Sequence, residues 1–127
     1  MSNIQQQEVL SFIANYAEVL NSGNSELIPH FFADGGLFMP DGYPTFTAGE
    51  KFKKSSTSFF RKNTILINYE INDISITGNF AFVNSNATTI TTDLTSNKKT
   101  TKDSRDFFVL QSESGEWKIL RYIFNNK

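Results

Sequence analysis

The side chains of this sequence that could do chemistry are carboxyls, phenols and a single imidazole. His30 is the only histidine and the chain has no cysteine, so the nitrogen and sulfur ligands of catalytic zinc sites are nearly absent. No serine stands in the Gly-x-Ser-x-Gly pattern of an activated nucleophile, and Gly35-Gly36 lacks the lysine of a phosphate-binding loop. We therefore expect no metal and no cofactor. Acid and base chemistry, or plain binding, remains.

Four residues are candidates for that chemistry. Tyr16 shares a face with apolar residues, Asp41 stands between a proline and a glycine, and Asp106 lies in a late apolar segment. His30 falls near the end of a short predicted helix, whose dipole favours a charged imidazole. Three of them also have a structural interpretation: Tyr16 as a core tyrosine, Asp41 as a turn residue and Asp106 as part of a strand ion pair. A carboxyl buried among phenylalanine rings would have a raised pKa and could act as an acid near neutral pH.

Large aromatic side chains supply candidates for ligand contact. The chain has 13 phenylalanines, four tyrosines and one tryptophan, and such rings can line a chamber as well as fill a core. The candidates for the lining are Phe38, Tyr43, Phe46, Phe52, Phe59, Phe60 and Tyr69. Arg121 could bind an anionic group of a ligand, or pair with Asp34 or Asp106.

Three helices are predicted to position these residues in the first half. The first runs from about residue 3 to residue 21, because apolar residues recur at helical spacing and Gly23 follows; they are Val9, Phe12, Ile13, Tyr16 and Leu20. A brief second helix starts at Asn24 or Ser25. Leu37 to Met39 reads as a short strand. Thr47 and Glu50 have the spacing of a capping box for a third helix, which ends near Asn63.

From Thr64 onward the apolar residues alternate, which predicts strands. The parity changes after Ile71, so we expect a bulge at Asn72-Asp73. Turn residues divide the rest into four long strands with short links, which suit an antiparallel meander. The predicted class is α+β: a strongly curved, mainly antiparallel sheet wrapped around three helices, in one domain over residues 1–127.

Composition restricts the partners. Twelve basic and 13 acidic residues give a net charge of −1, which provides no broad positive field for a nucleic acid. No apolar run approaches the roughly 20 residues that span a bilayer, and the polar N-terminus does not resemble a secretion signal. We expect a cytoplasmic protein that binds neither nucleic acid nor membrane. The segment from Phe107 to Leu110 is apolar on both faces, which predicts a homodimer through the outer face of the sheet.

Several motifs resemble the nuclear transport factor 2-like superfamily, and most of all its SnoaL-like and ketosteroid-isomerase-like branch. They are Tyr16 to Ile28 with Gly23, Phe31-Phe-Ala-Asp34, Phe38-Met-Pro40-Asp41-Gly, Gly49 before a helix, and Ser104 to Asn125. The resemblance implies a cone, similar to a cystatin-like α+β roll, in which a curved sheet and helices enclose an apolar chamber and the outer sheet face forms a dimer.

The resemblance also implies roles for individual residues. Tyr16 matches the helix tyrosine that donates a hydrogen bond to a developing enolate, and Asp106 lies near the protonated aspartate that does the same. The proton shuttle of the family aligns with Pro40, one residue before Asp41. His30 is a further candidate acid or base.

Three functions follow. The leading hypothesis is that the protein binds a small, largely apolar metabolite in a conical pocket. It would also transfer a proton on this metabolite, as isomerases, dehydratases or cyclases do. A non-catalytic binding or dimeric association module is the first alternative. An epoxide-hydrolase-like site is the second, and it would need Arg105 or Arg121 between Asp34 and Asp106 around a water.

Overall fold

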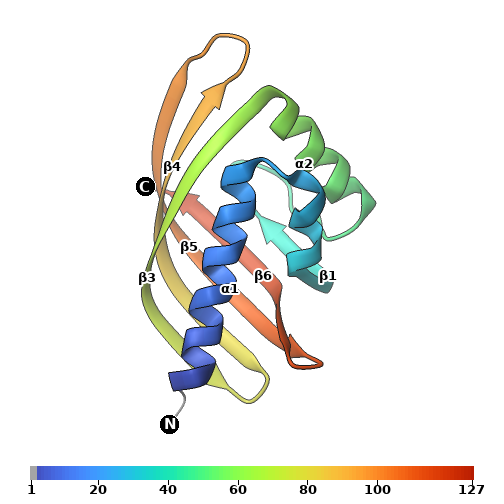
Figure 1. The fold of residues 1–127 in the computed structure, drawn as a ribbon, viewed down its shortest axis with the longest axis vertical. Coiled ribbons are helices and arrows are strands. Elements are labelled where there is room, and N and C mark those ends of the chain that lie inside the picture. The colour runs from blue at the N-terminus through green and yellow to red at the C-terminus, as the bar shows by residue number, and fades with distance from the viewer. Residues whose placement is uncertain (1–2) are drawn as a thin grey trace.

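The computed structural model describes residues 3–127, in which three helical segments accompany a six-stranded sheet (Figure 1). The elements in chain order are α1 (Asn3–Ser22), the 3₁₀ helix η1 (Ser25–Phe31), β1 (Phe32–Met39), β2 (Phe46–Thr47), α2 (Glu50–Lys62), β3 (Asn63–Thr77), β4 (Phe80–Asp93), β5 (Lys99–Glu113) and β6 (Glu116–Asn126).

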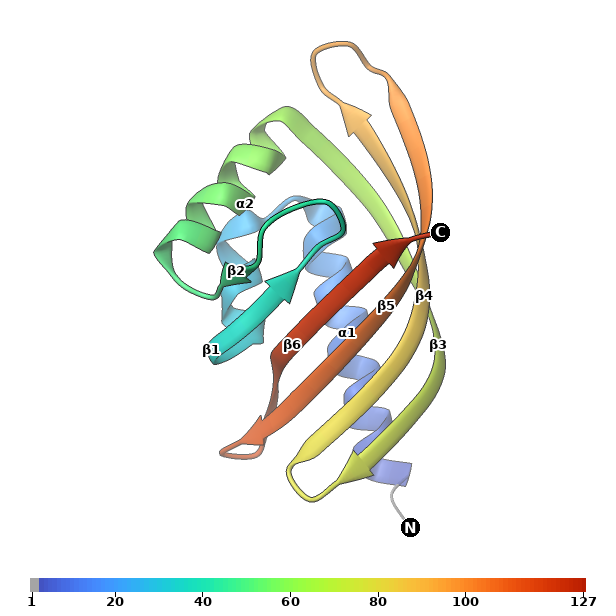
Figure 2. The same cartoon turned by 180° about the vertical axis from the view of Figure 1, so that it is seen from behind.

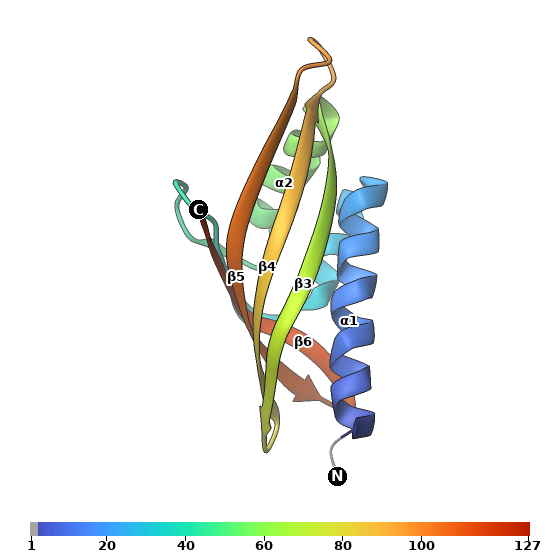
Figure 3. The same ribbon diagram turned by 90° about the vertical axis from the view of Figure 1, so that its left-hand side faces the viewer.

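The sheet is mixed and open, with the strand order β2-β1-β6-β5-β4-β3. Strands β3 to β6 form the predicted antiparallel meander, whereas β1 runs parallel to β6 (Figure 2). The long strands bend around one side, where α1 lies along the concave face (Figure 3). This arrangement confirms the α+β class and the curved sheet packed against three helices.

Local periodicity explains the elements that the sequence predicted. The apolar stripe of α1 is buried, with Val9, Ile13 and Tyr16 at most 2% exposed. The register of β3 against β4 shifts between Ile71 and Asp73, at the predicted bulge. No helix of residues 3–127 has the length and apolarity needed to cross a membrane.

One local prediction was wrong, and one strand is longer than predicted. Gly49 is the N-cap of α2 and makes no side-chain cap hydrogen bond, so Thr47 and Glu50 do not form a capping box. The predicted short strand at Leu37 belongs to a longer strand that begins at Phe32. The strand needs glycine at position 36, because a Cβ there would lie 2.7 Å from the carbonyl oxygen of Ile119 on β6.

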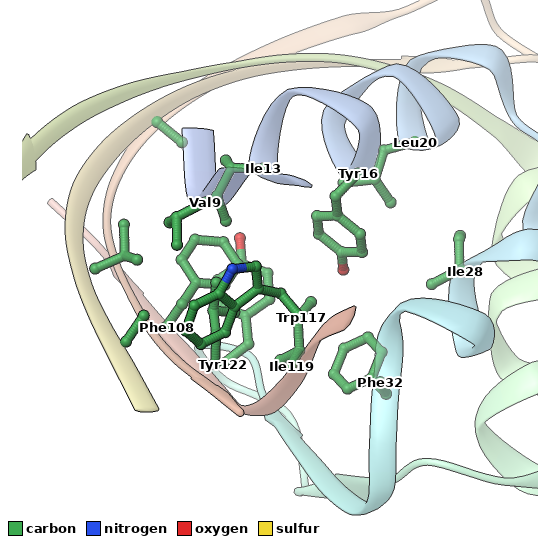
Figure 4. Packing of buried hydrophobic residues seen from close by; sticks show 14 of the residues in the cluster. Val9, Ile13, Tyr16, Leu20, Ile28, Phe32, Phe108, Trp117, Ile119 and Tyr122 are labelled. Atoms are coloured by element: carbon green, nitrogen blue, oxygen red, sulfur yellow. The ribbon is translucent and has the colours of Figure 1, made fainter. Parts of the chain in front are cut away.

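Aromatic rings fill the space between α1 and the sheet (Figure 4). The rings of Phe108 and Tyr122 stack with centroids 4.1 Å apart. Tyr16 meets this stack edge-on, with its ring centroid 6.1 Å from that of Tyr122 and 6.4 Å from that of Phe108. The interior around Tyr16 is therefore packed by rings.

Candidate active site

Tyr16 projects from α1 into the core, as its place on the apolar face predicted. Figure 4 shows its hydroxyl directed away from the helix, into the space between α1 and the sheet. The residue is 2% exposed, yet no hydrogen bond joins its hydroxyl to any residue of the described chain. Burial raises the pKa of Tyr16, and the charge of Asp106 raises it further. The hydroxyl therefore stays protonated and is a hydrogen-bond donor.

Asp106 is an inward-facing carboxyl on β5 that is 3% exposed. Its Oδ1 accepts a hydrogen bond of 2.6 Å from Ser104, and its Oδ2 accepts one of 2.5 Å from the hydroxyl of Tyr122. Burial raises the pKa of Asp106, while the hydrogen bonds from Ser104 and Tyr122 act in the opposite direction. Asp106 is therefore a carboxyl with a raised pKa, and the hydroxyls of Ser104 and Tyr122 hold its two oxygens in place.

A second phenol extends this arrangement. The hydroxyls of Tyr69 and Tyr122 lie 2.7 Å apart. Because the Tyr122 hydrogen points to Asp106, Tyr69 is the donor in this pair. A hydrogen-bonded chain therefore runs from Tyr69 on β3 through Tyr122 on β6 to Asp106 on β5. Such a chain orients its dipoles toward the carboxyl and can pass a proton along its length.

An open groove lies beside this cluster. It has a volume of about 730 Å³, which falls within the range of small-molecule sites. Three elements wall it, and its lining residues are Ile4, Gln7, Glu8, Ser11, Phe12 and Asn15 of α1, His30 and Phe31 of η1, and Gly115, Glu116, Trp117 and Lys118 at the β5–β6 hairpin. We call this hollow the α1–β6 groove.

Phe31 connects the α1–β6 groove with the buried cluster. It lines the groove, and its ring meets that of Tyr16 edge-on at a centroid distance of 5.3 Å. On the groove side it packs against Phe12 at 5.5 Å. The Tyr16 ring therefore lies directly behind one wall of the groove.

His30 belongs to the groove, whereas Asp41 does not. The exposed His30 lines the groove at the end of η1, and its backbone carbonyl accepts a 2.8 Å hydrogen bond from the Lys118 ammonium. Asp41 is exposed, and its carboxylate accepts a 2.9 Å hydrogen bond from the backbone N–H of Asn126. That contact fastens the turn after β1 to the end of β6.

The residues expected to contact a ligand occupy different environments. Phe38 and Tyr69 pack on Tyr122, with ring centroids 5.2 Å and 6.4 Å away. Tyr43 and Phe59 lie at the surface, where they are 72% and 42% exposed.

The arginines contact other groups. Arg121 donates a 2.7 Å hydrogen bond to the carbonyl of Leu120. Arg105 donates to the side chain of Asn125 at 3.1 Å. Because successive strand residues face opposite sides of a sheet, the exposed Arg105 and the buried Asp106 are separated by the sheet. Neither arginine forms an ion pair with Asp34 or Asp106 in the described chain, so the geometry that an epoxide-hydrolase-like site requires is not found there.

Sequence reasoning did not select Ser104, Tyr122 or Glu8. Ser104 and Asp106 share one face of β5 because strand residues alternate, but only the burial in the structure shows that this face is the inner one. Tyr122 was harder to find, because the register of β6 against β5 shifts between Val109 and Leu110. That shift changes which β6 residues face inward, and no local pattern predicted it.

The curved open sheet, the helix across its concave face and the buried acid–phenol cluster define a cystatin-like α+β protein with a candidate acid–base site. A family model for the SnoaL-like domain matches residues 9–124. The chain belongs to the SnoaL-like family of the nuclear transport factor 2-like superfamily. No curated protein matches it.

Solved structures show the same fold. A ketosteroid isomerase-like protein of Erwinia carotovora atroseptica is 21% identical with a TM-score of 0.86, over 98% of this chain and 97% of that one. A hexachlorocyclohexane dehydrochlorinase is 5% identical with a TM-score of 0.80, over 98% and 86%. A cystatin-like domain of Nostoc punctiforme is 11% identical with a TM-score of 0.77, over 100% and 80%. Similarity at these identities supports the fold and leaves the chemistry to the site.

Proposed function

We propose that the protein binds a small, largely apolar metabolite with an oxygen that accepts a hydrogen bond from Tyr16, and that it transfers a proton on this metabolite. Isomerases, dehydratases and cyclases perform reactions of this kind. The observation that carries the proposal is the hydroxyl of Tyr16, which has no hydrogen-bond partner in residues 3–127 but keeps some accessible surface, on a residue that is only 2% exposed and lies beside a buried acid. A donor of this kind can stabilise charge that develops on a ligand oxygen.

The α1–β6 groove holds the body of the ligand in this proposal. Its aromatic wall contains Phe12, Phe31 and Trp117, and apolar contact with such rings supplies most of a small ligand's affinity. Phe31 separates the groove from Tyr16, so rotation of this half-buried ring admits the ligand oxygen to the hydroxyl. His30, on the wall of the same groove, takes or gives the proton.

The cluster behind Tyr16 has a supporting role. Both carboxyl oxygens of Asp106 are engaged by Ser104 and Tyr122, so Asp106 influences the ligand through its charge and through Tyr122. Asp41 takes no part, because its carboxylate holds the end of β6.

Binding can be tested without knowing the natural ligand. Trp117 is the only tryptophan and lines the groove, so its fluorescence reports ligand entry. We expect para-nitrophenol to quench it, and Tyr16→Phe to weaken binding about 5- to 10-fold, the equivalent of one hydrogen bond. Tyr43→Phe removes a hydroxyl from an exposed tyrosine and should leave the affinity unchanged. Equal affinity in the wild type and Tyr16→Phe would remove Tyr16 from the site.

Proton transfer needs a separate measurement. A ketone such as α-tetralone exchanges its α-protons in deuterium oxide, and nuclear magnetic resonance follows the loss of the proton signal. We expect the wild type to accelerate the exchange, and His30→Gln to lose most of that acceleration while still binding para-nitrophenol. If the wild type gives only the buffer rate, the catalytic part of the proposal fails and a binding module remains.

We also propose that the outer face of the sheet forms a homodimer. Three exposed apolar side chains lie on the outer face of the sheet, with Phe80 and Phe82 each 37% exposed and Ile123 44% exposed. Such a patch favours burial against a second copy. Sedimentation velocity should give a dimer for the wild type and a monomer for the double variant Phe82→Lys and Ile123→Lys. A monomeric wild type would contradict the proposal.

A further inference from the structure

The α1–β6 groove has a charge pattern that selects among ligands. Its lining includes the carboxylates of Glu8 and Glu116, the ammonium of Lys118 and the imidazole of His30. The Lys118 ammonium is already used, because it donates to the His30 carbonyl at 2.8 Å and pairs with Glu116 at 3.7 Å. Glu8 has no ion-pair partner within residues 3–127. Apart from His30, the lining therefore carries one excess negative charge, located at Glu8.

The distance along α1 between Glu8 and Tyr16 sets the length of a ligand that would reach both residues. Glu8, Phe12 and Tyr16 follow one another at intervals of four residues on α1, so each is the neighbour of the next on the helix surface, and the row turns by about 80° from the exposed Glu8 to the buried Tyr16. Eight residues at the α-helical rise correspond to about 12 Å along the axis. Phe12 and Phe31 lie between the two polar ends and provide an aromatic surface.

We propose that the ligand of the α1–β6 groove is an elongated planar ring system with a protonated amine at one end, held by Glu8, and an oxygen at the other end, directed to Tyr16. The inference rests on the proposed function and adds the ligand's charge and size. Two or three fused rings match the span of about 12 Å along α1. A cation is favoured by the carboxylate and by the neighbouring aromatic faces, which attract positive charge. A carboxylate or phosphate at the same end is disfavoured by repulsion from Glu8.

Three probes of one shape separate charge from shape. Naphthylmethylamine is cationic at pH 7, naphthylmethanol is neutral and naphthylacetate is anionic, and equilibrium dialysis measures their binding to the full chain. We expect the amine to bind best, with an affinity about 5- to 20-fold above that of the carboxylate, because the exposed Glu8 attracts the amine and repels the carboxylate. Added salt should reduce the ratio.

A matched pair of variants identifies the responsible group. Glu8 and Glu18 are both exposed glutamates of α1, but only Glu8 lines the groove. Glu8→Gln should bring the amine-to-carboxylate ratio close to one, whereas Glu18→Gln should keep the wild-type ratio. The inference is overturned if the wild type binds the carboxylate as tightly as the amine, if Glu8→Gln leaves the ratio unchanged, or if no probe binds.

The same experiment separates this inference from the proposed function. Tyr16→Phe should weaken the binding of para-nitrophenol. It should leave the amine-to-carboxylate ratio of the naphthyl probes unchanged, because these three probes need not reach the Tyr16 hydroxyl. A Tyr16 variant without effect on para-nitrophenol, together with a ratio that depends on Glu8, would refute the Tyr16 role and keep the charge selectivity. The reverse result would refute the charge selectivity alone.

Discussion

The hydroxyl of Tyr122 donates a 2.5 Å hydrogen bond to the carboxyl of Asp106 across two neighbouring strands. In the register, Asp106 lies opposite Phe124 and Tyr122 lies opposite Phe108, so the two residues are diagonal neighbours on one face of the sheet. A tyrosine is long enough to span such a diagonal. The contact holds a buried carboxyl whose pKa is raised by burial and is lowered in part by this hydrogen bond.

The stability contribution of Asp106 should decrease as pH rises. Burial raises the pKa of Asp106 in the folded protein, above the value of about 3.9 in an unfolded chain. The folded state therefore retains this proton to a higher pH than the unfolded state. The contribution is complete below about pH 3.9 and is lost as pH rises through the folded pKa. Urea unfolding at a series of pH values should show that the wild type loses stability relative to Asp106→Asn from about pH 4 upward.

Asp93 provides the control with the opposite sign. The backbone N–H groups of Ser96 and Thr95 lower the pKa of Asp93, so its contribution is present above the unfolded value and is lost as pH falls. Relative to Asp93→Asn, the wild type should lose stability toward acid pH. Two variants with the same pH profile would contradict the assignment of both carboxyls.

Tyr122→Phe should destabilise the protein at neutral pH. The change removes the hydrogen bond from the phenol to Asp106 and raises the pKa of this carboxyl further. A hydrogen bond to a charged group contributes about 1.5–3 kcal/mol, and we expect a loss of this size in the free energy of unfolding in urea. Tyr43→Phe, at a position that is 72% exposed, should change the free energy very little. Equal effects of the two substitutions would show that the Asp106 contact is not stabilising.

Asn21→Ala should loosen the end of α1 from the sheet. The Asn21 side chain donates to the carbonyl of Ile67 at 3.1 Å and accepts from its N–H at 2.7 Å. Because β3 is an edge strand, these backbone groups have no neighbouring strand to pair with. We expect a loss of about 1–3 kcal/mol in unfolding free energy and faster amide exchange at Ile67. Asn15→Ala, an exposed change on the same helix, is the control, and amide exchange at Ile67 equal to that of the control would refute the role.

Adjacent glycines of β1 should differ sharply in their tolerance of alanine. A Cβ on Gly36 would lie 2.7 Å from the carbonyl oxygen of Ile119 and 2.9 Å from that of Ala33, and both are backbone atoms. Gly35 has a φ of +72° but no atom within 4 Å of the added Cβ. Gly35→Ala should therefore produce only backbone strain of about 1–2 kcal/mol. Gly36→Ala should lower the thermal midpoint more, since β1 must move away from β6. Similar midpoints for both variants would contradict this difference.

Much of the fold could be predicted from the sequence, because helical and strand periodicities are local. The stripe on α1, the alternation from Thr64 onward and the bulge near Asn72 all depend on neighbours within a few residues. The length of strand β1 was underestimated, because Asp34-Gly35-Gly36 has the composition of a turn and the predicted strand began only at Leu37. It is a strand because β6 offers a parallel partner, and that partner lies far along the chain.

The sequence by itself determined which way Tyr16 faces, since side-chain direction follows from the period of the helix, whereas it left the direction of Asp106 open. Only the tertiary structure decided what they meet. Tyr122 is 16 residues from Asp106 and 53 from Tyr69 in the chain, and its contacts depend on the register of three strands and on one shift within it. The α1–β6 groove likewise exists only where α1, η1 and the β5–β6 hairpin come together. Register and packing are sums over many distant contacts, so no local pattern encodes them.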